Sequence, residues 1–97
     1  MKIVREALAG TLESSDLMVR IAPRDQGLEI VLQSEVIHQF GAQIEAVARD
    51  TLAKLGIEAA VVIIEDKGAL DCVIRARIQT VVQRAADEWT ADWSALA

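Results

Sequence analysis

Side chains that commonly perform catalysis or bind metals are scarce in this chain of 97 residues. It contains one histidine, His38, one cysteine, Cys72, and no tyrosine. A serine or cysteine nucleophile needs a base within reach, so every such scheme would require His38, and no nucleophile motif accompanies it. One Cys and one His supply no cluster with the spacing of metal ligands, and the carboxylates are scattered. We therefore expect neither catalysis by the chain itself nor a metal site.

Positive charge and long apolar runs are also in short supply. Ten Lys and Arg residues stand against 15 Asp and Glu residues, which gives a net charge of -5. Nucleic-acid and anionic-membrane binders need a surplus of cations, so we expect neither kind of partner. No apolar run approaches the roughly 20 residues that cross a bilayer. Charge within residues 1–6 is unlike a signal peptide, and a lone cysteine excludes an internal disulfide, so the expected location is cytoplasmic.

The composition that is present is that of a folded domain. Apolar residues make up 53% of the chain and charged residues 26%, well outside the range typical of disorder. The length suits one compact domain, which we place at residues 1–86, followed by a C-terminal tail at residues 87–97. Trp89 and Trp93 lie four residues apart in that tail. They are expected either to cap the core or to dock on a partner subunit.

Two alternating runs predict a pair of strands in the first third of the chain. Leu17–Ala22 and Leu28–Gln33 each place every second, apolar residue on one face. Residues 23–27, between them, begin with proline and end with glycine, which is typical of a turn. The two runs are therefore predicted to form an antiparallel hairpin.

Two further strands and one polar turn complete the predicted sheet. Ala7–Leu12 could form a short first strand, although its glycine weakens it, and Glu13–Asp16 then indicates a turn. Ala59–Ile64 is rich in β-branched residues and too short for an independent helix. It is predicted to be a central strand covered on both faces.

Helical spacing of apolar residues predicts two long helices. The first is expected to begin after an N-cap at Ser34, to end before a left-handed residue at Gly56, and to bury one face. Its marked positions are Val36, Ile37, Phe40, Ile44, Val47, Thr51, Leu52 and Leu55. The second helix is marked by Leu70, Val73, Ile74, Ile78, Val81, Val82 and Ala85. Cys72, near the start of the second helix, is predicted to be a small buried residue.

The element order is then β-β-β-α-β-α. A strand, helix, strand unit spans Leu28 to Ile64, and such a unit places its helix on one side of the sheet. The predicted fold is α+β, a two-layer sandwich in which a small mixed β-sheet carries two long helices on one face.

The polar turn holds the candidate functional residues. Glu13, Ser14, Ser15 and Asp16 place two hydroxyls side by side between two carboxylates. Such clusters are usually ordinary hydrophilic turns, and the residues alone do not choose between the two serines. A carrier of a covalent group needs only an exposed hydroxyl on an ordered turn, because the modifying enzyme brings the activation.

Two sequence blocks resemble a known family. The first is Ala-Gly-Thr-Leu-Glu-Ser-Ser-Asp at residues 9–16, continued by Met18–Pro23, and the second is Asp66–Arg77. Both blocks, at this separation, are similar to the acyl carrier (gamma) subunit of citrate lyase. The similarity runs from Met1 to about Arg84 and weakens in the tail.

The resemblance implies a covalent cofactor on Ser14. In that family the serine directly after Gly-Thr-Leu-Glu carries a phosphodiester-linked 2'-(5''-phosphoribosyl)-3'-dephospho-coenzyme A, and adjacency to Glu13 selects Ser14 here over Ser15. The implied chain is a non-catalytic carrier whose arm holds acetyl and citryl thioesters while citrate is cleaved to acetate and oxaloacetate. Its implied partners are the transferase (alpha) and lyase (beta) subunits and the holo-carrier synthase that attaches the prosthetic group.

Four other functions are alternatives. The carrier subunit of malonate decarboxylase is similar in size and uses the same type of arm, but the second block resembles the citrate lyase form. An ordinary phosphopantetheine carrier would open a helix with Asp-Ser-Leu, whereas Ser15-Asp16-Leu17 enters a strand here. A non-carrier adaptor domain and a stand-alone hydrolase remain as alternatives from different functional classes.

Charged residues near these blocks carry further hypotheses. Glu13 and Asp16 could be recognised by a basic surface of the modifying transferase. Arg75 and Arg77, two residues apart, point in different directions on a helix. We expect them on a solvated ionic face, with Arg75 paired to Asp71, in preference to a contact with the arm's phosphates or a partner subunit.

Overall fold

The six elements follow the predicted order along the chain. The computed structural model describes residues 2–34 and 37–87, without the side chains of residues 37–39. Its elements are β1 (Ala7–Gly10), β2 (Leu17–Ala22), β3 (Gly27–Ser34), α1 (Ile37–Lys54), β4 (Ala59–Asp66) and α2 (Asp71–Ala85). Within the described residues, neither helix has the length and apolar character needed to cross a membrane.

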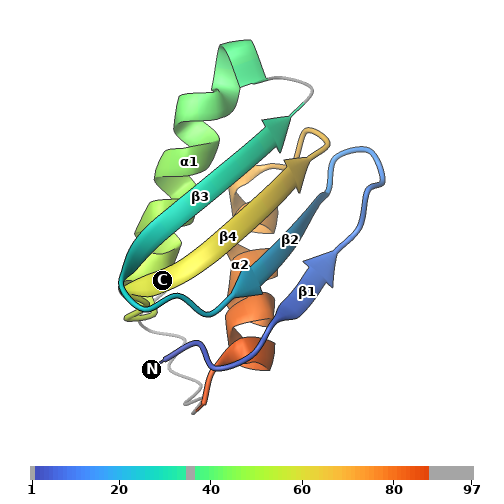
Figure 1. Ribbon diagram of the computed structural model, residues 1–97. Helices are drawn as coiled ribbons and strands as arrows, with labels where there is room; N and C mark the ends of the chain where they lie inside the picture. Colours follow the sequence, from blue (N-terminus) through green and yellow to red (C-terminus); the bar gives the residue numbers. More distant parts are fainter. Residues whose placement is uncertain (1, 35–36, 88–97) are drawn as a thin grey trace.

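A mixed four-stranded sheet forms one layer and the two helices form the other. The strand order is β1-β2-β4-β3, with β4 antiparallel to β2 and parallel to β3. Both helices lie behind the sheet, as Figure 1 shows, and α1 packs on α2 and β3 while α2 packs on β1 and β2. The predicted α+β two-layer sandwich is confirmed.

The predicted hairpin between β2 and β3 is wrong, because β4 lies between these strands. Ile64 of β4 pairs with Val19 of β2 on one side and with Leu32 of β3 on the other. β2 and β3, which lie on either side of β4, still run antiparallel to each other, as the alternation and the short turn predicted. Helix α1 returns the chain so that β4 runs parallel to β3, and β4, with Ala60, Val62 and Ile64 buried, is hydrogen-bonded along both of its edges.

The core lies between the sheet and the helices. From the sheet it takes the predicted face of β2 together with Ala60, Val62 and Ile64 of β4, all fully buried. The other face of β4 is only half-buried, at Val61 and Ile63, since both helices lie on one side. The prediction that this strand is covered on both faces is therefore wrong.

Helix α1 ends as predicted, whereas its start differs from the pattern. Gly56 is left-handed, with φ +74°, and the amide of Ile57 donates to Leu52 O at 3.0 Å, which closes the last turn. Ser34, the expected N-cap, is the last residue of β3, and its hydroxyl donates to Asp66 Oδ2 at 2.9 Å. Residues 35 and 36, where α1 would be capped, lie outside the described residues.

Three apolar positions of the sequence pattern are exposed. Phe40 is 48% exposed and Leu70, which precedes α2, is 69% exposed. Leu12, at the end of the predicted first strand, is 47% exposed because β1 stops at Gly10. The pattern is wrong at these places because the first turns of the helices and the loop after β1 extend beyond the end of the packed layers.

The N-terminal segment holds the far end of α2. The amide of Val4 donates to Ala85 O at 3.0 Å. The guanidinium of Arg5 donates to Arg84 O at 3.1 Å and to Ala86 O at 3.0 Å. These bonds satisfy carbonyls that a helix C-terminus leaves open, so the position of α2 is defined at this end.

Candidate functional site

Ser14 lies at the tip of the loop between β1 and β2, which we call the Ser14 loop (residues 11–16). Ser14 and Ser15 are the central residues of a turn closed by the amide of Asp16, which donates to Glu13 O at 3.2 Å. The φ of Ser15 is +65°, the left-handed value that a type II turn needs at its third residue. The side chain of Ser14 is exposed and makes no hydrogen bond within the described part of the chain.

Asp16 ties the Ser14 loop to helix α2. Its Oδ1 accepts from the amide of Leu17 at 2.7 Å and from Arg77 Nε at 3.0 Å. Its Oδ2 accepts from Thr11 Oγ1 at 2.6 Å and from Arg77 Nη2 at 2.8 Å. Both carboxylate oxygens are thus used, the guanidinium binds in the bidentate mode, and only 13% of the Asp16 side chain is exposed.

This ion pair changes the acid–base behaviour of both partners. Hydrogen bonds from Arg77, and next from Thr11, hold the pKa of Asp16 well below its usual range, although burial acts in the opposite direction. The hydrogen bond to Asp16 raises the pKa of Arg77. Asp16 is therefore ionised throughout the physiological range, with its charge compensated inside the chain.

A second set of bonds connects the Ser14 loop to the loop between β4 and α2. The amide of Ser15 donates to Lys67 O at 2.8 Å, and the amide of Lys67 donates to Asp16 O at 2.9 Å. Asp66, only 2% exposed, accepts from the amides of Gly68 and Ala69, each at 3.0 Å. The loop that supports Ser15 is thus itself rigidly held.

Gly10 forms the base of the Ser14 loop. Its φ is +93°, and a Cβ at this position would lie 1.9 Å from Leu17 O. The same carbonyl accepts from the amide of Thr11 at 3.1 Å. Glycine is required here because no side chain fits between the two strand ends.

Sequence comparison identifies the family to which this loop belongs. The citrate lyase acyl carrier protein of Rhodopseudomonas palustris (strain BisA53) is 73% identical over 96 residues, which are 99% of each chain. The chain belongs to the citrate lyase acyl carrier protein family. The citrate lyase acyl carrier protein of Enterobacter sp. (strain 638) is 66% identical over 97% of both chains. The predicted family resemblance is confirmed.

The wider carrier group includes malonate decarboxylase subunits. A family model described as malonate decarboxylase delta subunit (MdcD) matches residues 4–85. A chain in the crystal structure of a Pseudomonas malonate decarboxylase hetero-tetramer in complex with malonate has the same fold, with a TM-score of 0.71 and 24% identity. The match covers 87% of this chain and 91% of that chain. The fold is therefore shared across this group.

The two serines of this acyl carrier family member differ in their backbone roles. Ser15 donates its amide to Lys67 O and occupies the strained left-handed region. Ser14 has neither constraint, and its side chain is exposed. Sequence adjacency to Glu13 and this difference in anchoring thus favour the same residue.

The structure corrects two predictions about charged residues. Arg77 is more than a solvated charge: its side chain, 37% exposed, binds Asp16. The charge of Asp16 is therefore already paired within the chain, while Glu13 is exposed. Among the described residues, Arg75 forms no ion pair with Asp71. Instead, Asp71 Oδ1 accepts a hydrogen bond from Gln43 Nε2 at 3.3 Å. The signal that was missed is that Asp16 and Arg77 occur in the two blocks that carry the resemblance.

The remaining candidates lie away from the Ser14 loop or outside the described residues. Cys72 is exposed, so its predicted burial is wrong: the buried side of α2 begins at Ile74, and position 72 points to the other side. The side chain of His38 and the residues Trp89 and Trp93 lie outside the described residues. Among those described, no group of three or more His, Cys, Asp and Glu side chains could hold a metal ion.

Proposed function

We propose that this chain is the acyl carrier subunit of citrate lyase, and that Ser14 Oγ carries the 2'-(5''-phosphoribosyl)-3'-dephospho-coenzyme A arm through a phosphodiester. The observation that supports this is the exposed, unbonded hydroxyl of Ser14 on a loop whose base is fixed by Asp16 and Gly10. An accessible hydroxyl on a defined turn can enter the active site of a modifying enzyme without unfolding its surroundings.

Attachment requires only one reaction at Ser14. Its Oγ forms a bond to a phosphorus atom of the activated arm, the leaving group of that donor departs, and the hydroxyl proton passes to a base of the holo-carrier synthase. Neither carboxylate of the turn is held as a base for Ser14: Asp16 is engaged by Arg77, and the exposed Glu13 side chain has no hydrogen bond among the described residues that would orient it. The chemistry therefore belongs to the synthase.

The carrier acts by tethering. A covalent arm keeps its thioester at a high effective concentration near successive active sites, here those of the transferase (alpha) and lyase (beta) subunits. Acetyl and citryl groups would alternate on the arm as citrate is cleaved to acetate and oxaloacetate, and the carrier itself would catalyse neither step. A cytoplasmic location, expected from the sequence, stays a prediction.

The choice of Ser14 is tested by intact mass. After co-expression with the modifying enzymes, wild type and Ser15→Ala are expected to gain the mass of the arm, and Ser14→Ala is expected to gain none. Circular dichroism checks that the wild type and both variants are folded. Arm attachment to Ser14→Ala would exclude Ser14 as the site, and an unmodified wild type would overturn the carrier function.

The malonate decarboxylase carrier remains the second candidate, because the family model that matches residues 4–85 has that description. The relatives at 73% and 66% identity favour citrate lyase. The modified chain is expected to restore citrate cleavage to carrier-depleted citrate lyase subunits. Restored malonate decarboxylation by carrier-depleted malonate decarboxylase, with no citrate cleavage, would reverse the assignment.

A further inference from the structure

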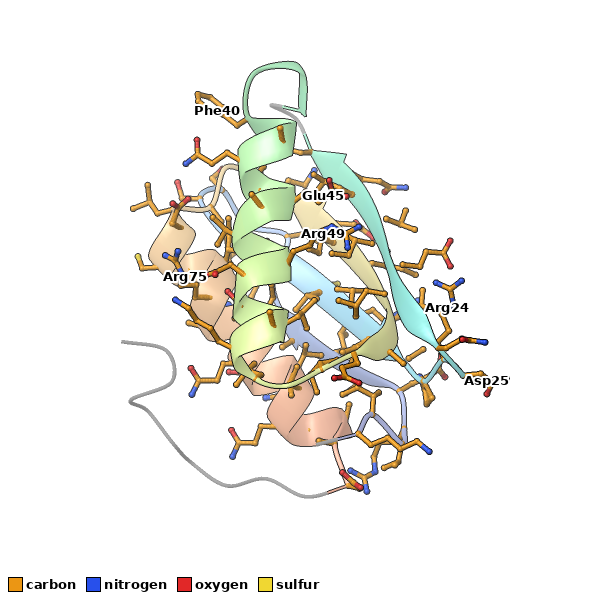
Figure 2. All side chains as sticks on the ribbon, turned by 90° about the vertical axis from the view of Figure 1, so that its left-hand side faces the viewer. Arg24, Asp25, Phe40, Glu45, Arg49 and Arg75 are labelled. Atoms are coloured by element: carbon orange, nitrogen blue, oxygen red, sulfur yellow. The ribbon has the colours of Figure 1, made fainter. Side chains whose placement is uncertain are left out.

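An apolar groove lies between the N-terminal ends of the two helices. It has a volume of about 670 Å³, and Phe40 and Ile44 of α1 line it opposite Leu70 and Cys72 at the start of α2. In Figure 2, Phe40 projects from the N-terminal end of α1 instead of packing into the core. The exposed side chains of Phe40 and Leu70 line this groove. Its volume is within the usual range for small-molecule sites.

The groove and the Ser14 loop share a structural element. Asp66, Gly68 and Ala69 form part of the groove lining. The residue between them, Lys67, accepts the amide of Ser15 at 2.8 Å and donates its own amide to Asp16 O. One short loop thus separates the attachment turn from the groove, at the end of the sheet where β4 finishes.

The charge of the groove limits what it can bind. Its described lining contains the carboxylates of Asp66 and Asp71 and no lysine or arginine. Asp66 is buried and satisfied by its own loop, whereas Asp71 is half-buried and faces the groove beside Gln43. A phosphate would meet negative charge without a compensating cation, so a neutral group with apolar parts and amides is favoured.

We propose that this groove binds the neutral pantetheine end of the arm attached to Ser14. The inference rests on the proposed function, which supplies the arm. The pantetheine end has methyl groups, two amides and a thiol, which match the apolar walls and the side-chain amide of Gln43. The phosphates of the arm stay outside, next to the Ser14 loop. Docking keeps the thiol close to the carrier until a partner subunit takes it up.

Cys72, one of the residues that line the groove, provides a probe of its occupancy. Its thiol is exposed in the unmodified chain and should react readily with iodoacetamide. With the arm on Ser14, its alkylation is expected to be at least threefold slower, because a threefold effect corresponds to a groove occupied for about two thirds of the time. Peptide mapping separates Cys72 from the arm thiol, since Lys and Arg residues lie between them.

A matched control places the thiol elsewhere. Ala53 is exposed in the last turn of α1, at the end of the helix away from the groove. In the variant Cys72→Ser with Ala53→Cys, the arm is expected to leave the alkylation rate unchanged. Leu70→Asp, compared with wild type at equal arm occupancy by intact mass, is expected to abolish the protection of Cys72.

The outcomes separate this inference from the proposed function. If intact mass shows the arm on Ser14 but Cys72 reacts equally fast with and without it, the carrier function stands and the inference that the groove binds the pantetheine end is overturned. Equal protection of both thiol positions would indicate general shielding and would also overturn the inference. If no arm is attached, the proposed function itself fails.

Discussion

Gly10→Ala is expected to lower the free energy of unfolding by about 3 kcal/mol. A residue with a side chain in the left-handed region costs about 1–2 kcal/mol, and overpacking against fixed backbone adds about 1–3 kcal/mol. The added Cβ would lie 1.9 Å from Leu17 O, which is a backbone atom of β2 and cannot rotate away. Urea denaturation followed by circular dichroism measures the change.

Gly27→Ala is the matched control for this substitution. Gly27 also has a positive φ, +81°, but a Cβ there would meet nothing within 4 Å. The free energy of unfolding of Gly27→Ala should fall by only about 1 kcal/mol, the conformational cost of a side chain at positive φ. If the two variants lose equal stability, the close approach of Gly10 to Leu17 does not support the Ser14 loop, and its geometry must be maintained by other contacts.

Asp16→Asn is expected to lower the free energy of unfolding by about 2 kcal/mol at pH 7. The substitution removes the charge that Arg77 binds through two hydrogen bonds of 3.0 and 2.8 Å. The expected loss is modest because the Arg77 side chain is 37% exposed and solvent weakens the ion pair. Glu13→Gln removes one negative charge from the same turn at a position with no ion pair to any described residue, and it should change stability by less than about 0.5 kcal/mol.

The stability difference between wild type and Asp16→Asn should also depend on pH. The folded-state pKa of Asp16 lies below its unfolded value of about 4, so its contribution is complete above pH 4 and is lost as the pH falls further. The difference measured at pH 7 should therefore shrink progressively as the pH is lowered from about 4 towards 2. A difference that stays constant over this interval would mean that the charge of Asp16 is not what stabilises the loop.

Sequence patterns predicted those features well that depend only on residues close together in the chain. Alternation placed Leu17, Val19 and Ile21 on the buried face of β2, and this is confirmed because a strand turns every second side chain to the same side. Gly56 was predicted as the left-handed end of α1, since only glycine adopts that conformation without cost. These inferences required no knowledge of which strands are neighbours.

The pairing of elements was predicted less well. The four residues between β2 and β3 are compatible with a hairpin turn. In the structure, however, they span the space of one further strand, and β4 occupies that space. Cys72 was predicted to be buried from its neighbours in the sequence, yet the direction of a side chain at a helix start depends on where the helix meets the sheet. Competition among partners for the sheet centre is a property of the whole chain.

The sequence by itself determined the α+β class, the buried face of β2, the polar turn and, through its two blocks, the family of the Ser14 loop. Only the tertiary structure decided that Asp16 belongs to Arg77, 61 residues away, and that the attachment turn adjoins a groove between the helix ends. Such contacts arise when β4 pairs with β2 and brings its loop beside the turn. A one-dimensional pattern encodes which face a residue takes, whereas the partner it meets depends on how all the elements pack.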